Sequence, residues 1–173
     1  MPGFHRNKYP TDMDKAAFMA KFGAVFEHSP WVADAVYGMP AELSDDASLA
    51  AQFESVFLAS DPALQLSTLK AHPQLACALA APVELTPDSI REQSDAGIDQ
   101  CTVAELAEFS RLNTDYNEKF GFPFIIAVKG RTRQEILKIF RERLDNDLKL
   151  EFQTALQQAC RIARFRIMDI ING

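Results

Sequence analysis

The sequence has few of the residues that cross-link small proteins. Its 173 residues include three cysteines, Cys77, Cys101 and Cys160, and none of them stands in a Cys-x-x-Cys spacing. An odd and sparse set of cysteines does not make a disulfide framework, and a chain of this length buries roughly 70% of its unfolded surface without one. We therefore expect reduced thiols that are mostly buried.

Signals for membranes, export and peroxisomes are also missing. The apolar run Phe122 to Val128 is seven residues long, whereas a membrane-spanning helix needs about 20. The first residues, MPGFHRNKYP, lack the apolar core of a secretory signal, and the last, IING, do not form a peroxisomal signal. We expect a cytoplasmic protein that does not enter a membrane.

Charge and motif content exclude further classes. The formal net charge of −6 argues against general binding of nucleic acid or anionic membranes. The sequence contains no glycine-rich phosphate loop, no spacing typical of metal ligands and no cofactor fingerprint. A function based on the chain's own side chains is therefore expected, with no metal and no organic cofactor.

The sequence does contain many helix signals. Thr11 with Asp14, Thr102 with Glu105 and Thr132 with Glu135 resemble capping boxes, while Asp61 and Thr86 each precede a proline at a first helical position. Helices are expected at residues 12–27, 30–37, 47–59, 62–71, 73–80, 87–96, 103–120, 133–146 and 148–171. The predicted fold is an all-α, single-domain bundle of about eight or nine helices over residues 1–173, with residues 1–11 as a polar tail.

One segment does not follow the helical pattern. The stretch KFGFPFIIAVKG, residues 119–130, has consecutive apolar residues, an internal proline and flanking glycines. We expect residues 121–130 to form an extended apolar segment, which leaves backbone N–H and C=O groups open to other partners. From the residues alone, it is either a buried connection or a place where the backbone binds a ligand.

The first candidate for chemistry is His72, in LKAHPQLACAL. Because Pro73 disfavours the helical conformation of the residue before it, His72 should be held extended between two helices, at the N-terminus of the second. An imidazole there titrates near neutral pH, which suits acid–base chemistry. The alternative is a histidine that only caps a helix.

A second candidate group lies in TPDSIREQSDAG. On a helix begun by Pro87, Ser89, Glu92 and Gln93 share one face, and Gly97 is the expected C-cap. A hydroxyl, a carboxylate and a carboxamide on one face suit a small polar heterocycle. The alternative is a short solvated surface helix.

The third candidate is Arg166 in the last helix. The expected apolar stripe of this helix contains Arg166, whereas Arg161 and Arg164 project from the opposite side; the stripe consists of Leu148, Phe152, Leu156, Ala159, Ala163 and Ile170. A buried guanidinium needs an anionic partner. That partner is either a carboxylate of the protein or an anionic ligand bound at two points.

Taken in order, AHPQLA, SIREQSDAGI, LNTDYNEKFGFPFIIAVKG, ILKIFRERLDNDLKLE and RIARFRI resemble the OHCU decarboxylase family over roughly residues 15–171. That family acts on 2-oxo-4-hydroxy-4-carboxy-5-ureidoimidazoline in the pathway from urate to allantoin. The resemblance implies an all-α, homodimeric, cofactor-free decarboxylase that yields (S)-allantoin.

The resemblance also assigns roles to residues. It implies that His72, Glu92 and Arg166 are catalytic. The implied substrate-binding residues are Pro73, Ser89, Gln93, Phe124, Ile125, Ile126, Ala127 and Val128. The sequence departs from the family pattern at Gln74, at Cys77-Ala78 and at Val128, none of which is an implied catalytic group.

Two other functions fit the sequence. One is a non-catalytic α-helical interaction module, and the other is a lyase acting on a related hydroxy-carboxylated heterocycle.

Overall fold

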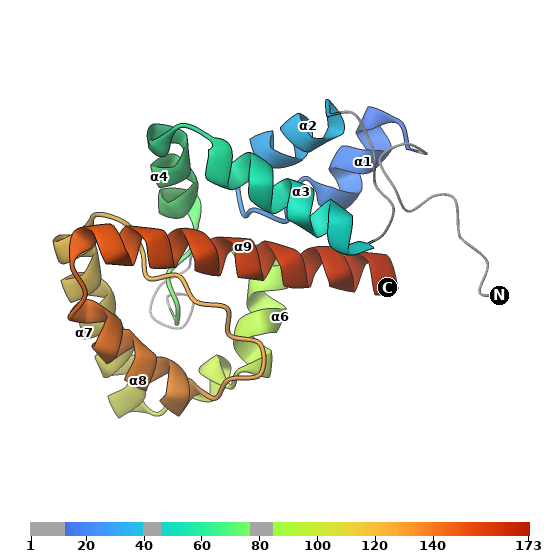
Figure 1. Ribbon diagram of the computed structural model, residues 1–173. Coiled ribbons are helices and arrows are strands. Elements are labelled where there is room, and N and C mark those ends of the chain that lie inside the picture. Colours follow the sequence, from blue (N-terminus) through green and yellow to red (C-terminus); the bar gives the residue numbers. More distant parts are fainter. Residues whose placement is uncertain (1–12, 40–45, 77–84) are drawn as a thin grey trace. The chain divides into compact units, whose positions relative to one another are not determined.

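The computed structural model describes residues 13–39, 46–76 and 85–173. In these residues it contains eight α-helices, one short 3-10 helix and no strand (Figure 1). The all-α prediction is therefore confirmed. Within residues 13–39, 46–76 and 85–173, no helix has the length and hydropathy that a membrane span requires.

The chain divides into two compact units. One unit comprises Met1–Thr68 and Cys160–Gly173, and the other comprises Leu69–Ala159. The long last helix α9, Leu148–Asn172, therefore contributes residues to both units.

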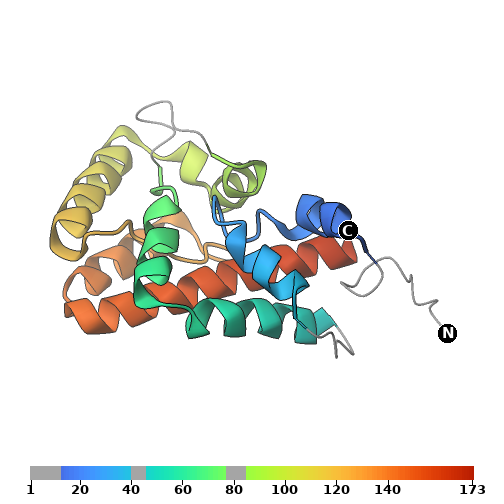
Figure 2. The same ribbon diagram turned by 90° about the horizontal axis from the view of Figure 1, so that it is seen from above.

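The first unit is built around phenylalanine rings. Its helices are α1 (Lys15–Phe22), α2 (Trp31–Tyr37), α3 (Asp46–Ala59) and most of α4 (Pro62–Ala71). Helix α2 packs against α1 and α3, as Figures 1 and 2 both show. The rings of Phe18 and Phe22, 5.0 Å apart, both face Phe53 of α3 at 6.2 Å.

The second unit carries the motifs that point to chemistry. It contains α6 (Pro87–Asp95), the 3-10 helix η2 (Ile98–Gln100), α7 (Val103–Phe120), α8 (Arg133–Leu144) and the first part of α9. Helix α7 packs against α8, and α6 against η2. The extended segment connects the end of α7 to the start of α8 (Figure 1).

Local capping explains where several helices begin. Both capping boxes, Thr102 with Glu105 and Thr132 with Glu135, are formed. Such side chains satisfy N–H groups that have no partner inside the helix.

The two residues predicted to cap before a proline also do so. Thr86 accepts a hydrogen bond from the backbone N–H of Ser89. The Asp61 carboxylate accepts from the N–H of Ala63. Both helices therefore begin where the sequence predicts.

Some predicted helix boundaries are wrong. Helix α1 begins at Lys15 with Asp14 as its N-cap, and it ends at Phe22 rather than at residue 27. The chain turns at Gly23, where a Cβ atom would lie 2.4 Å from the Met19 carbonyl oxygen. Thr11 lies outside the described residues.

The helix predicted at 73–80 is wrong over its described part. Residues 73–76 form an extended piece and a turn, in which Ala76 has a φ of +59°; residues 77–80 lie outside the described range. Gly97, at φ +77°, follows the actual cap residue Ala96 by one position. The stripe of α9 is also shifted, because Leu148 is 58% exposed while Ile162 and Ile167 are buried.

The prediction of reduced, mostly buried cysteines is confirmed for the two cysteines that the structure describes. Cys160 is a buried free thiol, and burial raises its pKa to about 12. Cys101 is a half-buried free thiol whose pKa is raised, first by burial and then by the nearby Glu105 carboxylate. Cys77 lies outside the described residues. Both described thiols are therefore protonated at neutral pH.

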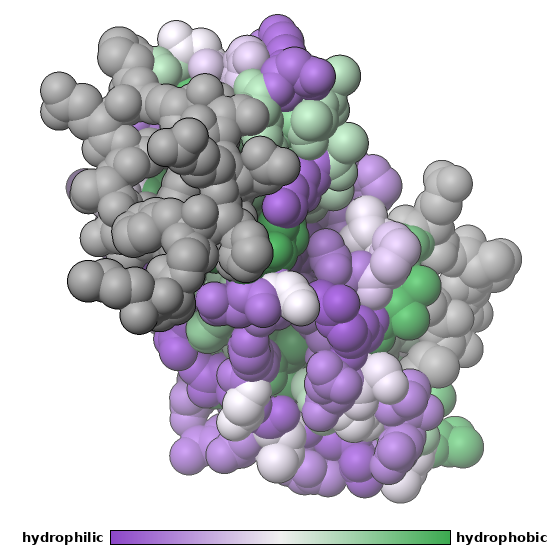
Figure 3. Space-filling model, turned by 90° about the vertical axis from the view of Figure 1, so that its right-hand side faces the viewer, coloured by the Kyte–Doolittle hydropathy of each residue, from purple (hydrophilic) through white to green (hydrophobic). Residues whose placement is uncertain are grey.

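On the face shown in Figure 3, hydrophilic residues cover most of the coloured area and hydrophobic ones lie in small separate groups. Charged residues make up 24% of the sequence, in agreement with this view.

The central part of the segment at residues 121–130 is buried and non-helical, as expected, whereas Gly121 and residues 129–130 are exposed. Residues 122–128 are all buried, although none of them belongs to a helix or strand. The Phe124 ring stacks on Phe140 of α8 at 3.7 Å, and the Arg143 guanidinium lies 4.4 Å from the centre of the Phe124 ring. Aromatic packing thus keeps the segment in the core of the second unit.

A buried ion pair supports this segment. The Arg143 Nε donates to Glu151 at 2.7 Å, and its Nη1 donates to the carbonyl oxygen of Ile125 at 2.7 Å. The Tyr116 hydroxyl donates to the same Glu151 carboxylate, and burial raises the pKa of Tyr116 well above its usual range. Tyr116 is therefore a neutral donor, and Glu151 joins α7, α8 and α9.

We expect Arg143→Met to lower the free energy of unfolding by about 3–5 kcal/mol, because it leaves the fully buried Glu151 carboxylate without its cation. The matched control is Arg164→Met, which breaks an ion pair with Glu54 whose side chains are 42% and 39% exposed. That loss should stay within about 1 kcal/mol. Urea unfolding followed by circular dichroism measures both, and equal losses would contradict the role given to Arg143.

Candidate active site

His72 follows helix α4 directly. Its backbone N–H donates to the carbonyl oxygen of Leu69 at 3.2 Å, so the histidine is tied to the last turn of that helix. Its side chain is half-buried, as is Pro73. His72 therefore lies just after a helix and outside it, as predicted. The prediction that a second helix follows directly is wrong, because the described residues 73–76 are not helical.

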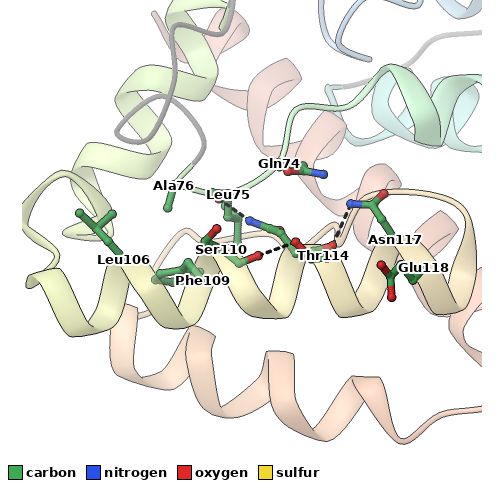
Figure 4. Close-up of a pocket in the computed structure, with 10 residues that line it drawn as sticks. Gln74, Leu75, Ala76, Leu106, Phe109, Ser110, Thr114, Asn117 and Glu118 are labelled. Carbon is green, nitrogen blue, oxygen red and sulfur yellow. Dashed lines mark hydrogen bonds between the residues drawn. The ribbon is translucent and has the colours of Figure 1, made fainter.

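The residues after Pro73 are bound by side chains from two helices. The Asn113 carboxamide of α7 donates to the carbonyl oxygen of Leu75 at 2.9 Å, which is the dashed line at Leu75 in Figure 4. The Gln93 carboxamide oxygen of α6 accepts from the N–H of Ala76 at 3.1 Å. The segment that carries His72 is therefore bound to α6 and α7.

Helix α6 presents the predicted polar face. Ser89 is buried at 3% exposure, whereas Glu92 and Gln93 are half-buried. The bond from Ala76 to Gln93 places this face beside the residues that follow His72. Two of the three candidate groups are thus brought together within the second unit.

The backbone of the extended segment is partly occupied by the protein itself. The N–H of Ala127 donates to the Gln158 side chain at 3.0 Å, and its carbonyl oxygen accepts from Arg131 Nε at 3.3 Å. The carbonyl oxygen of Ile125 is bound by Arg143. These three backbone groups therefore already have partners within the protein. A ligand role for the backbone of Phe124–Val128 stays a prediction.

Arg166 lies in the first unit and is buried at 2% exposure. Its guanidinium donates to the Glu27 carboxylate at 3.2 Å and to the carbonyl oxygen of Val25 at 3.5 Å. The protein carboxylate that the sequence left open as a partner is therefore present. The ligand role of Arg166 stays a prediction.

The other two arginines of this helix lie toward the surface, as predicted. Arg161 is exposed, and its guanidinium lies 5.7 Å from the Phe165 ring. Arg164 pairs with Glu54 at 2.9 Å.

Two cavities border Ala76. The larger, of about 380 Å³, lies between Gln74, Leu75 and Ala76 on one side and helix α7 on the other (Figure 4). The smaller, of about 190 Å³, is lined by Ala76, Gln93 and residues of α6 and η2. The smaller cavity thus includes one predicted substrate-binding residue, Gln93.

The described residues contain no group of three or more His, Cys, Asp or Glu side chains that could hold a metal ion.

Several residues that bind the candidate site residues were not predicted from the sequence. Glu27, the partner of Arg166, lies 139 positions from it, and no local pattern connects the two. Asn113 did carry a signal, because it is a polar residue on the buried face of α7, beside Leu112. Gln158, which binds Ala127, is half-buried and gave no such signal.

The fold and the site define a class first: an all-α protein with an imidazole and a polar helix face joined through one short segment. Comparison with known proteins gives the family. Residues 11–168 match the family model described as OHCU decarboxylase. The chain belongs to the OHCU decarboxylase family.

Individual relatives agree with this family. The chain is 38% identical to the 2-oxo-4-hydroxy-4-carboxy-5-ureidoimidazoline decarboxylase of Halalkalicoccus jeotgali, over 91% of this chain and 86% of the relative. It is 39% identical to the uric acid degradation bifunctional protein PucL of Bacillus subtilis, over 92% of this chain and 31% of that protein. The chain thus spans about a third of that longer relative.

Solved structures have the same fold. A crystal structure of (S)-allantoin synthase matches with a TM-score of 0.75 at 29% identity, covering 94% of this chain and 52% of that chain. A structure titled OHCU decarboxylase in the presence of (S)-allantoin matches with a TM-score of 0.72 at 24% identity, covering 88% of this chain and 99% of that chain. The second match supports the fold alone.

We expect Arg166→Met to cost about 3–5 kcal/mol of unfolding free energy, because it removes the cation beside the buried Glu27 carboxylate. Arg161→Met, at an exposed position of the same helix, should stay within about 0.5 kcal/mol. The double variant Glu27→Leu/Arg166→Met removes both charges and should recover most of the loss. Urea unfolding measures all three variants.

The double variant also separates the two roles of Arg166. If Arg166 binds the substrate, decarboxylation by the folded double variant falls strongly, because no other group replaces the guanidinium. If the double variant has activity near wild type, the role of Arg166 is limited to its ion pair with Glu27, and Arg166 does not bind the substrate.

Proposed function

We propose that this protein decarboxylates 2-oxo-4-hydroxy-4-carboxy-5-ureidoimidazoline to (S)-allantoin and CO₂ in the degradation of urate. The observation that carries the proposal is the bond between Ala76 and Gln93, which joins the His72 segment to the polar face of α6. Family membership and the names of the relatives from Halalkalicoccus jeotgali and Bacillus subtilis support the same reaction.

The proposed roles follow the chemistry of each group. His72, with Glu92 as its carboxylate partner, hydrogen-bonds the C4 hydroxyl or carboxylate and moves its proton. Pro73, Ser89 and Gln93 contact the substrate. The backbone of Phe124–Val128 binds the edges of the heterocycle. The guanidinium of Arg166 binds the substrate and, with this backbone, orients it for catalysis.

The substrate itself supplies the electron sink. When the bond between C4 and the carboxylate breaks, its electron pair moves toward the neighbouring C=N bond, and CO₂ leaves. The ring nitrogen of the former C=N bond takes up a proton. The C4 hydroxyl then loses its proton to become a carbonyl while the ureido carbon is protonated, which gives neutral allantoin. Because the electrons are accepted within the ring, this route needs neither a metal nor an organic cofactor.

The same family resemblance supports three further proposals. We propose that the protein is a homodimer, that it acts in the cytoplasm, and that residues 1–173 form one domain of this family.

The proposed function is tested by the handedness of the product. Without enzyme, water protonates either face of the flat intermediate and the allantoin is racemic. A site that holds one face of the ring gives one enantiomer, and a difference of about 3 kcal/mol between faces corresponds to an excess of more than about a hundredfold. We expect freshly generated substrate to give a growing circular dichroism signal of (S)-allantoin when the protein is present.

Two controls accompany this assay. Dialysis against EDTA should leave the signal unchanged, whereas His72→Asn should slow it by roughly 10²-fold or more with folding retained. Substrate that disappears faster with protein but gives no dichroism would mean that the intermediate escapes. No acceleration by the wild-type protein would contradict the proposed function itself.

A further inference from the structure

One peptide group in the site is bound at both ends by carboxamides. The carbonyl oxygen of Leu75 and the N–H of Ala76 belong to the same peptide plane. Asn113 of α7 donates to the oxygen at 2.9 Å, and Gln93 of α6 accepts from the N–H at 3.1 Å. Rotation of this plane would break both bonds, so the two side chains together set its orientation.

This orientation is one that the backbone would not choose by itself. Ala76 has a φ of +59°, in the left-handed region that residues other than glycine rarely adopt. Such conformations persist when surrounding bonds impose them, and they concentrate at functional sites. The carboxamides of Asn113 and Gln93 are the side chains that bind this peptide group, so they oppose its relaxation.

Asn113 also leaves a polar atom unsatisfied. It is buried at 6% exposure, and among the described residues its Oδ1 is the buried side-chain atom without a hydrogen-bond partner. Turning the amide over would place that oxygen against the Leu75 carbonyl oxygen. A leucine at this position of α7 would avoid the unpaired acceptor, so the residue is explained by its Nδ2 donor.

The bound peptide lies a short distance after His72. Three residues, His72, Pro73 and Gln74, separate the end of α4 from Leu75. The N–H of His72 is bound to Leu69 at one end, and the proline ring fixes one of the intervening φ angles. The freedom of the His72 backbone therefore depends on whether the Leu75–Ala76 peptide is held.

We propose that Asn113 is a positioning residue for His72, acting through the Leu75–Ala76 peptide together with Gln93. This inference rests on the proposed function, in which His72 handles the proton. Asn113 touches no substrate in this account. Its effect is to keep the imidazole in place during the chemical step, so it should influence kcat more than KM.

The test uses Asn113→Asp, which keeps the shape of the side chain and replaces the Nδ2 donor by a carboxylate oxygen. The matched control is Asn117→Asp, four positions further along α7 and bordering the same cavity. In wild type, the Asn117 Nδ2 donates to a carbonyl oxygen of its own helix, that of Asn113. The readouts are amide exchange of Ala76 by NMR and steady-state kinetics with circular dichroism detection.

For Asn113→Asp we expect exchange of the Ala76 amide to be at least about tenfold faster and kcat at least about tenfold lower, with KM within about twofold. The defect should shrink as the pH falls, because the introduced carboxyl group regains a donor for the Leu75 carbonyl oxygen once it is protonated. Asn117→Asp should match wild type in both readouts.

Three outcomes would overturn the proposal. Unchanged Ala76 exchange in Asn113→Asp means that Asn113 does not hold the peptide. Faster exchange with wild-type kcat per folded molecule means that the bond is structural only. A kcat defect that does not change with pH means that loss of the donor is not its cause.

A second variant and the exchange measurement keep the proposal testable if Asn113→Asp does not fold or if the wild-type protein is inactive. If Asn113→Asp does not fold, the double variant Asn113→Asp/Ala76→Gly removes the cost of the left-handed conformation, and kcat should remain low because the donor is still missing. If the wild-type protein does not decarboxylate, the proposed function fails. Exchange of the Ala76 amide still reports on the peptide itself in that case.

Discussion

The buried pair of Arg143 and Glu151 is the interaction on which the second unit depends. A helical protein that carries an extended, buried segment must find partners for backbone groups that a helix would satisfy internally. Arg143 supplies one by donating to Ile125, and it can be buried because Glu151 neutralises it. Glu151 also accepts from Tyr116 of α7. One carboxylate thus connects three helices to the segment between two of them.

The same arrangement recurs around His72. There the irregular backbone is bound by neutral carboxamides, with Asn113 and Gln93 holding one peptide group. In both places helices supply long polar side chains, and the segments between helices supply the backbone that these side chains hold. Irregular backbone beside a rigid scaffold is where binding and catalytic groups commonly occur, and the proposed site takes its groups from two such segments.

What the sequence predicted well is local. Capping boxes such as Thr102 with Glu105 depend on residues three positions apart, so they could be read directly. The end of α1 at Phe22 was missed because the apolar spacing continues through Val25 and Phe26, which are buried in turns rather than in a helix.

The partners of the candidate site residues could not be read in the same way. The candidates themselves came from local spacing and from the family resemblance. Their partners, such as Asn113 for Leu75 at 38 positions, depend on tertiary packing that no local pattern encodes.

The central claim is that the heterocycle binds between the His72 segment, the polar face of α6 and the backbone of Phe124–Val128. A crystal structure of this protein with (S)-allantoin bound tests it most directly. The account predicts the ring within hydrogen-bond distance, about 2.6–3.2 Å, of the Phe124–Val128 backbone and of a side chain on α6. Allantoin bound only in the larger cavity beside α7, or away from α6, would contradict it.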